Sequence, residues 1–230
     1  MKKKLLILGG SSDIGLELAN KLLNFNKYEI ILHFNSNKKL LLKKNGYKLL
    51  KCNLSKSNFK STLKKFDKNY DIIVNLVGYI SNNSFKDFKP TDFYKTINAN
   101  TLMPWMIIRK SLENMRQKNF GRIINTSSVG VKFGGGNRTF LYSISKYLNE
   151  FIPSYIKKLS KDNVLYNCLR IGVVDTKLHK KIKNKNLKIR ASLIPIRRIA
   201  KKEEIVDLLI YLINKNNFIN NETINITGGE

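Results

Sequence analysis

The segment YSISK places Tyr142 four residues before Lys146. In a helix, residues four apart lie on one face a turn apart, so the phenol and the ammonium would be neighbours. A nearby cation lowers the pKa of a phenol, and a more acidic phenol can donate a proton in catalysis. Because lysine is abundant in this chain, the pair also arises by chance, and only the remaining sequence can decide between chance and chemistry.

The size and charge of the chain limit the possible functions. A chain of 230 residues can bury one sizeable core, so we expect a single domain spanning residues 1–230. The net charge of +27 would normally indicate nucleic acid or an acidic membrane surface as a partner. The lysines are scattered along the whole chain with asparagine and isoleucine, which indicates compositional bias. We therefore expect no specific nucleic-acid partner and no membrane partner.

The cysteines and histidines predict neither disulfide nor metal. Cys52 and Cys168 lie far apart in apolar runs, which is typical of buried free thiols in a reducing compartment. His33 and His179 have no partners at metal-ligand spacing, so we predict no metal site. The first apolar run, Leu5 to Leu8, is too short for a signal peptide, and no run is long enough to span a bilayer. These features predict a cytoplasmic protein.

Apolar runs alternate with segments of helical period from end to end. This alternation predicts an α/β fold, a Rossmann-like doubly wound parallel sheet of about seven strands with helices on both faces. The predicted strands are Lys4–Leu8, Glu29–Phe34, Tyr47–Cys52, Asp71–Val77, Arg122–Thr126, Val164–Ile171 and Thr223–Ile226. The predicted helices are Ile14–Asn24, Lys56–Phe66, Thr91–Gln117, Tyr142–Ser160 and Lys202–Ile213. The irregular segment Val174–Ile196 is interpreted as a flap over a site.

The first strand leads directly into LGGSSDIG, from Leu8 to Gly15. A glycine turn between a strand and a helix lets the backbone approach a pyrophosphate, while free amides at the helix start point toward it. An ordinary tight turn would use the same glycines. The position after the first strand of an alternating chain favours dinucleotide binding.

From this turn onward the sequence resembles the short-chain dehydrogenase/reductase family. Gly9 and Gly15 match the first and last glycines of the family's TGxxxGxG turn, whereas Asp13 replaces the middle glycine and Leu8 the threonine. An aspartate tolerates a left-handed backbone and can cap a helix, so the turn can survive. The carboxylate of Asp13 must point away from the phosphates if a dinucleotide binds.

The resemblance continues in order through nearly the whole chain. NLVG is similar to the family's NNAG, and INANTLMPW contains the helix-embedded asparagine, Asn100. GRIINTSSVG places Ser128, the second of its two serines, where the family has its catalytic serine. YSISK supplies the YxxxK pair, NCLRIGVVDT is similar to N-x-x-x-P-G-x-x-x-T with Ile171 in place of proline, and ITGGE resembles the closing glycines. Several motifs in the right order predict the function far better than any one of them.

The resemblance implies roles for individual residues. Tyr142 would be the acid/base, Lys146 would lower its pKa and hold the cofactor ribose, Ser128 would bind the substrate oxygen, and Asn100 would support a water-linked proton path. A tyrosine pKa of about 10 is roughly three units too high, or about 4 kcal/mol. One positive charge about 4 Å away contributes roughly that much at an effective dielectric constant of about 20. The implied cofactor-binding residues are Gly9, Ser11, Ser12, Ile14, Gly15, Asn35, Lys38, Asn53, Leu54, Asn75, Gly78, Tyr142, Lys146, Gly172, Val174 and Thr176.

The end of the second predicted strand indicates which cofactor is preferred. An acidic residue there would bind the adenosine ribose and repel a 2′-phosphate, and ILHFNSNKK contains none. Asn35, Ser36 and Asn37 can donate to a phosphate, and Lys38 or Lys39 could neutralise it. We therefore expect NADP(H) to be favoured over NAD(H).

The substrate is less defined. Phe133, Arg138 and Phe140 are candidate contacts, and we favour a small or sugar-derived carbonyl compound. A 3-oxoacyl group on an acidic carrier protein is the first alternative, but Asn119 and Asp162 stand where such relatives place docking arginines. A catalytically inactive cofactor-binding regulator is the second alternative. The resemblance also implies a homo-oligomer, a dimer or tetramer that pairs the helices after Thr91 and Tyr142.

Overall fold

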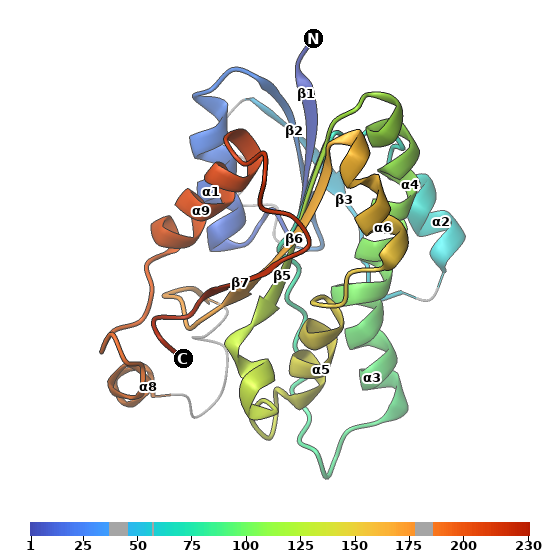
Figure 1. Ribbon diagram of the computed structural model, residues 1–230. Coiled ribbons are helices and arrows are strands. Elements are labelled where there is room, and N and C mark those ends of the chain that lie inside the picture. Colours follow the sequence, from blue (N-terminus) through green and yellow to red (C-terminus); the bar gives the residue numbers. More distant parts are fainter. Residues whose placement is uncertain (37–45, 57, 178–185) are drawn as a thin grey trace.

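The computed structural model describes residues 1–36, 46–56, 58–177 and 186–230. Seven parallel strands form one sheet in the order β3-β2-β1-β4-β5-β6-β7, with helices on both faces (Figure 1). The predicted Rossmann-like doubly wound α/β fold is confirmed. The strands are β1 (Lys3–Leu8), β2 (Tyr28–Phe34), β3 (Tyr47–Lys51), β4 (Ile72–Asn75), β5 (Gly121–Ser128), β6 (Val164–Ile171) and β7 (Thr223–Ile226).

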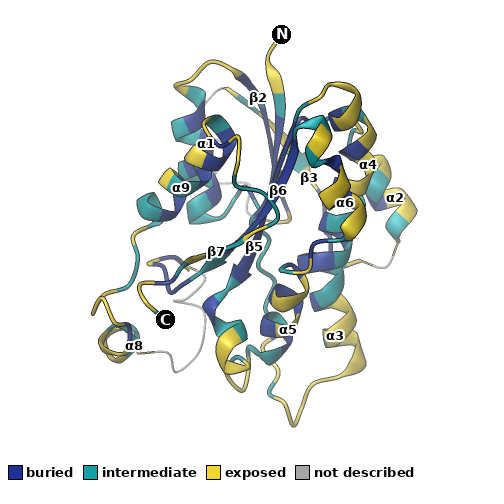
Figure 2. Cartoon of the chain, viewed as in Figure 1, coloured by how far each residue is buried: buried dark blue, intermediate teal, exposed yellow. Residues whose placement is uncertain are grey.

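The apolar runs of the sequence form the inner strands because both faces of the sheet are covered. Strands β1, β2, β4, β5 and β6 are buried over nearly their whole length, whereas the edge strands β3 and β7 are largely half-buried or exposed (Figure 2). Continuous apolar residues are what a parallel strand between two helical layers requires. Cys52 and Cys168 are free and buried, as predicted.

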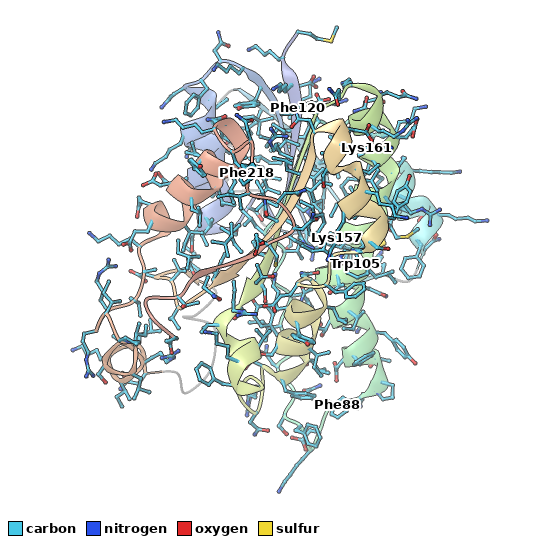
Figure 3. All side chains as sticks on the ribbon, viewed as in Figure 1. Phe88, Trp105, Phe120, Lys157, Lys161 and Phe218 are labelled. Carbon is cyan, nitrogen blue, oxygen red and sulfur yellow. The ribbon has the colours of Figure 1, made fainter. Side chains whose placement is uncertain are left out.

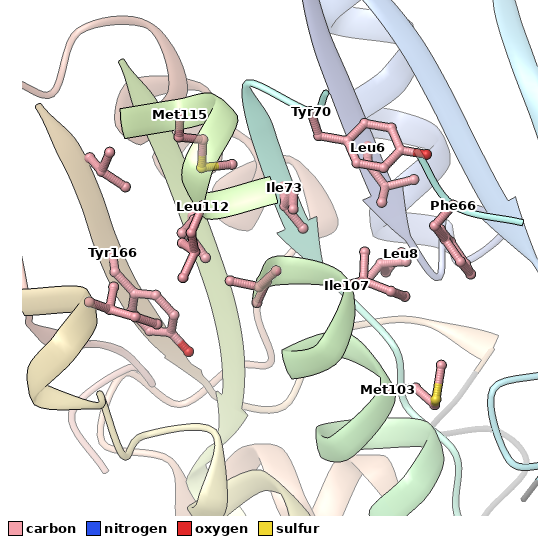
Figure 4. Packing of buried hydrophobic residues seen from close by; sticks show 14 of the residues in the cluster. Leu6, Leu8, Phe66, Tyr70, Ile73, Met103, Ile107, Leu112, Met115 and Tyr166 are labelled. Carbon is pink, nitrogen blue, oxygen red and sulfur yellow. The ribbon is translucent and has the colours of Figure 1, made fainter. Parts of the chain in front are cut away.

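Two helical layers enclose the sheet. Helices α1 (Asp13–Leu23) and α9 (Lys202–Asn214) pack together on one face, where Leu18 and Leu22 of α1 are buried. The other face is covered by α2 (Phe59–Lys64), α4 (Met103–Gln117) and α6 (Ser154–Lys158) (Figure 1). Figure 4 shows the core of this second face, including Leu6, Ile73, Ile107, Leu112 and Met115. Each fully buried side chain of this size contributes about 1.5–3 kcal/mol.

The helix predicted from Thr91 to Gln117 consists of three parts. Helix α3 (Pro90–Ile97) continues into the π-helical turn η1 (Asn98–Leu102), which leads into α4. Pro104 has no backbone N–H and cannot bond the carbonyl of Asn100, four residues earlier. The N–H of Met103 reaches the carbonyl of Asn98, five residues back, so the chain widens into a π-turn here.

The helix predicted from Tyr142 to Ser160 is also interrupted. Helix α5 (Phe140–Leu148) ends before Pro153. Pro153 has an extended backbone, with ψ 138°, and is the N-cap of α6. The 3-10 turn η3 (Leu159–Asp162) follows α6. Proline disfavours a helical backbone at the residue before it, which accounts for the break. In the predicted flap, α8 (Leu187–Leu193) is helical. Asn37, Lys38, Lys39 and His179 lie outside the described residues.

The direction of the chain reverses between β1 and β4. From β1 the chain runs outward to β2 and β3, then returns to the other side of β1 to form β4. In doubly wound sheets, the crevice outside the carboxyl ends of strands at such a switch point binds ligands. The segments that follow β1 and β4, beginning at Gly9 and Leu76, meet at this point.

Candidate active site

A cavity of about 1200 Å³ opens at the carboxyl ends of the strands. Most of the predicted site residues line it, from segments far apart in the sequence. They are Gly9, Ser11, Ser12, Ile14, Asn35, Asn53, Leu54, Gly78, Ser128, Tyr142, Lys146, Gly172, Val174 and Thr176. Gly15, Asn75 and Asn100 do not line it, and Lys38 lies outside the described residues.

The glycine turn brings backbone close to the cavity. Gly9 has φ +73°, and a Cβ there would lie 2.8 Å from the carbonyl oxygen of Leu76. A Cβ on Gly15 would lie 2.8 Å from the Cα of Gly10, so that glycine is needed for turn-to-helix packing. Ser12 caps α1 by accepting a hydrogen bond from the Gly15 amide at 3.1 Å. The start of α1 therefore presents its amides at the cavity wall.

The carboxylate of Asp13 is bound to the start of the predicted flap. Its Oδ2 accepts a hydrogen bond from the backbone N–H of Lys177 at 2.7 Å, and its Oδ1 lies 3.9 Å from the Lys177 Nζ. The residue that departs from the family's glycine pattern thus joins the turn to the segment after Thr176. The adjacent ammonium offsets the negative charge that Asp13 brings near the cavity.

Asn100 connects three elements beneath the cavity. Its side chain accepts from the Tyr79 amide at 2.8 Å and donates to the Tyr79 carbonyl and the Ser145 Oγ, each at 2.9 Å. Its backbone carbonyl, left without a helical partner by Pro104, accepts from the side-chain amides of Asn75 at 3.3 Å and Asn149 at 3.1 Å. Asn100 is thus fully buried and holds α5 against the loop after β4.

Ser127 and Ser128 are the last two residues of β5, and their hydroxyls have different hydrogen-bond partners. The Oγ of Ser128 accepts from the Gly130 amide at 3.2 Å and caps the 3-10 turn η2 (Val129–Phe133), so this hydroxyl lies at the cavity. The Oγ of Ser127 donates to Glu150 at 2.6 Å, and Glu150 forms a salt bridge with Arg170 at 2.6 Å. Ser128 is therefore the serine whose hydroxyl is available to a ligand.

Tyr142 and Lys146 share one face of α5, as their spacing predicts. The Lys146 Nζ lies 5.6 Å from the centre of the Tyr142 ring. Lys146 is only 2% exposed and donates to the Val77 carbonyl at 2.8 Å and to both oxygens of Thr126 at 3.1 Å. These three acceptors fix the ammonium between the ends of β4 and β5.

The pKa of Tyr142 departs from the sequence-based expectation. Although part of the side chain borders the cavity, burial raises the pKa of Tyr142 to about 12. Burial also lowers the pKa of Lys146 to about 8, because it desolvates the charged ammonium. The prediction that Lys146 alone makes Tyr142 more acidic is therefore wrong, since desolvation of the phenolate outweighs attraction to a nearby, itself desolvated cation.

Buried polar residues support the site from below the cavity. Asn75 donates to the Asn125 side chain at 2.6 Å, and Asn125 donates to the Tyr166 hydroxyl at 2.8 Å. Asn75 is fully buried, so its side chain supports the strand ends and does not line the cavity. Asn125 and Tyr166 were not predicted as site residues, and their polar atoms inside apolar strand runs were the available signal.

The outer wall combines aromatic, apolar and charged side chains. Phe133 and Arg138 line the cavity as predicted, whereas Phe140 packs against Phe85 and Phe88 with ring centres 5.1 and 5.2 Å away. From α8, Arg190 and Leu193 also line the cavity. The described end of the predicted flap therefore does border the site.

A family model described as enoyl-(acyl carrier protein) reductase matches residues 12–230. A solved structure described as a short-chain dehydrogenase/reductase family protein superposes with a TM-score of 0.84, covering 99% of this chain and 96% of that chain at 19% identity. The chain belongs to the short-chain dehydrogenase/reductase family. It is therefore one of the family's NAD(P)-dependent oxidoreductases, as the order of motifs implied.

Relatives and structural neighbours agree on this family. A 3-oxoacyl-[acyl-carrier-protein] reductase from Rickettsia prowazekii is 27% identical over 99% of this chain and 96% of its own length. Nodulation protein G from a Rhizobium strain is 27% identical with the same coverage. The structure of ElxO with NADP bound has a TM-score of 0.81 at 24% identity, covering 100% of this chain and 98% of that chain.

Within the described ranges, two other kinds of site are absent. None of their helices combines the length and apolarity needed to cross a bilayer. The same residues contain no group of three His, Cys, Asp or Glu side chains close enough together to hold a metal ion.

Proposed function

We propose that this protein reduces a carbonyl compound to an alcohol with NADP(H), with Tyr142 as the proton donor. The observation that carries the proposal is the meeting of Ser128, Tyr142 and Lys146 with the glycine turn around one cavity. Residues 1–230 would act as one domain, since a single sheet connects the two cores. The buried free thiols favour a reducing, cytoplasmic location.

The cavity suits a dinucleotide. Gly9 leaves no room for a side chain between the turn and Leu76, and the first turn of α1 supplies amides for a pyrophosphate. Asn35 and Ser36 line the cavity after β2, and the described residues there include no carboxylate that would repel a 2′-phosphate. This supports NADP(H) over NAD(H). The nicotinamide, when bound, supplies the hydride.

The site residues divide the remaining chemistry between them. The hydroxyl of Ser128 donates a hydrogen bond to the substrate oxygen and orients the carbonyl. As negative charge develops on that oxygen, Tyr142 transfers its proton, because an alkoxide is a stronger base than a phenolate. Lys146 stabilises the resulting phenolate by its charge and holds the ribose. A pKa of about 12 keeps Tyr142 protonated at neutral pH, which favours the direction of reduction.

For the substrate we favour a small or sugar-derived carbonyl compound. The wall formed by Phe133, Arg138 and Arg190 offers both apolar and hydrogen-bonding contacts. A 3-oxoacyl group on an acidic carrier protein is the second candidate, favoured by the names of the relatives and by the net charge of +27. Asn119 and Asp162, at the positions of the expected docking arginines, argue against it.

The substitution Tyr142→Phe tests the mechanism. We expect it to keep the affinity for NADPH and to lower carbonyl reduction at least 100-fold, since general acid catalysis typically contributes that much. NADPH binding is measured by fluorescence and turnover by absorbance, over a panel of carbonyl compounds. A phenylalanine variant as active as the parent would remove Tyr142 from the mechanism. A parent that binds NADPH without reducing any compound would favour the inactive regulator.

The same panel separates the two substrate classes. It contains a 3-oxoacyl carrier protein, the matching 3-oxoacyl thioester without its protein, and small keto sugars. A kcat/KM highest for the keto sugars would support our proposal. Preference for the carrier-bound substrate, lost when ionic strength rises, would instead establish the second candidate.

A further inference from the structure

His33 is a polar side chain near the end of β2, between the buried apolar residues Leu32 and Phe34. It is 3% exposed, and its ring packs against Phe66 with centres 5.8 Å apart. It also borders the cavity, near the carboxyl end of β2. In the sheet, β2 lies between β1 and β3 (Figure 1). The family motifs assign it no function, and the sequence analysis considered it only as a metal ligand.

Both ring nitrogens of His33 make hydrogen bonds to the backbone. Nδ1 lies 3.1 Å from the amide nitrogen of Gly9, and Nε2 lies 2.9 Å from the carbonyl oxygen of Cys52. The Gly9 amide can only donate, and the Cys52 carbonyl can only accept. The imidazole must therefore be neutral, with its hydrogen on Nε2. Burial agrees with this assignment, since it lowers the pKa of His33 to about 4.

These bonds join three strand ends. The amide of Gly10 donates to the His33 carbonyl at 2.8 Å, and the amide of Cys52 donates to the Phe34 carbonyl at 2.9 Å. The His33 ring adds a link from Gly9 to Cys52 that the strand ladder does not supply. The orientation of the first glycine of the turn thus depends on a side chain 24 residues later.

Gly9 is the residue whose position matters most for this link. Its φ is positive, and a Cβ at this position would lie only 2.8 Å from the Leu76 carbonyl oxygen, so both features limit where the turn can run. If the ring could not accept a hydrogen bond, the amide of the half-buried Gly9 would lose its protein partner. The peptide would then rotate toward another acceptor, moving the amides that follow it along the turn.

We propose that His33 is a positioning residue for the dinucleotide: its neutral imidazole holds the amide of Gly9 and so keeps the glycine turn in the nucleotide-binding geometry. The inference rests on the proposed function for the identity of the ligand. The hydrogen-bond assignment stands independently of that function, and each part has its own measurement.

The first measurement is the protonation state of the ring. The sequence contains only two histidines, so a nitrogen-15 spectrum of the labelled protein shows two imidazoles, and His33→Gln removes one. At pH 7 we expect the His33 signals of a neutral ring protonated on Nε2. A proton on Nδ1, or an imidazolium, would overturn the inference whatever the protein binds.

The second measurement is the dissociation constant of NADPH. His33→Phe fills the space without hydrogen bonding, and we expect it to weaken NADPH binding about ten-fold. His33→Gln offers one acceptor and one donor and should restore binding to within about three-fold of the parent. Phe66→Leu is the matched control: it disturbs the packing of the same ring without touching Gly9, and it should leave the affinity unchanged. Circular dichroism at the binding temperature confirms that each variant is folded.

The outcomes separate the inference from the proposed function. Tight NADPH binding by the parent and the Phe variant alike would overturn the positioning role and leave the function intact. Equal weakening in the Phe, Gln and Leu variants would show that destabilisation alone is responsible, which also overturns it. If the parent binds neither NADPH nor NADH, the proposed function and the positioning role both fail.

Discussion

Lys146 is a buried cation that the described structure surrounds with neutral acceptors. Val77 and Thr126 supply three oxygens, but burial still lowers the lysine's pKa from 10.5 to about 8. The spacing of YSISK did predict the shared helix face. The effect on protonation depended on how deeply α5 lies in the fold, and composition and spacing carry no information on that depth. Keeping the buried Lys146 protonated therefore lowers the free energy of unfolding at neutral pH.

This destabilisation by Lys146 predicts how the free energy of unfolding depends on pH. Between pH 8 and 10.5 the folded protein has lost the Lys146 proton while the unfolded chain keeps it, so stability rises with pH in that window. The slope is about 1.4 kcal/mol per pH unit and the total about 3 kcal/mol. Urea unfolding of the parent and Lys146→Met at pH 7, 8 and 9 measures this effect: the stability of the parent relative to the variant should rise with pH, mainly above pH 8.

The control for this prediction is Lys157→Met, which removes an exposed lysine, labelled in Figure 3. Its stability difference from the parent should stay constant over the same pH range. Burial also raises the pKa of Tyr142 to about 12, which lowers stability above pH 10 and confines the test to lower pH. A difference between the parent and the Lys146 variant that is flat from pH 7 to 9 would contradict the prediction.

At the scale of elements, the sequence predicts strands better than helices. The bounds of β6 match the prediction at both ends, because an apolar run between two covering layers leaves few alternatives, and the bounds of the edge strand β7 match as well. Two long predicted helices are interrupted ahead of a proline. The π-turn η1 precedes Pro104, whose missing N–H overrides helical periodicity, and the chain leaves the helix between Leu148 and Pro153. The π-turn η1 could have been anticipated from Pro104, but the partners of the freed Asn100 carbonyl come from distant segments.

Restoring the missing donor should therefore disturb the site. In Pro104→Ala the new N–H can bond the Asn100 carbonyl, in competition with Asn75 and Asn149. We expect η1 to become α-helical and Asn100 to shift, lowering kcat about ten-fold while the affinity for NADPH stays within two-fold. Pro90→Ala is the control, because Pro90 begins α3, where no intrahelical N–H bond is due. Steady-state kinetics of both variants that match the parent would refute this account of η1.

At the scale of the whole molecule, α5, α6 and the segment between them carry exposed aromatic side chains. Tyr147, Phe151 and Tyr155 are 65%, 64% and 61% exposed, and Trp105 of α4, labelled in Figure 3, lies 6.4 Å from Phe151 between ring centres. The Trp105 Nε1 is buried without a hydrogen-bond partner. Such a surface is typical of a subunit interface. It supports our proposal of a homo-oligomer that pairs the faces around α4 and α5.

A negative charge among these exposed aromatic side chains should separate the subunits. We expect the parent to be a dimer or tetramer at micromolar concentration by light scattering, and Tyr147→Glu to halve its mass, because an unpaired carboxylate would be buried in the interface. Phe25→Glu, which changes a 40% exposed aromatic residue after α1, is the control and should keep the parent's mass. A parent that scatters as a monomer would refute the proposed oligomer.

The two free thiols give the fold an internal pair of reporters. Cys168 is fully buried in the inner strand β6, whereas Cys52 follows the edge strand β3 and is 4% exposed. A thiol-specific reagent reaches Cys168 only when the central sheet opens, but it can reach Cys52 when the β3 edge alone separates. Because burial also raises the pKa of both thiols, neither reacts appreciably in the closed protein. The ratio of the labelling rates of Cys52 and Cys168 therefore distinguishes local opening of the β3 edge from global unfolding, without an engineered cysteine.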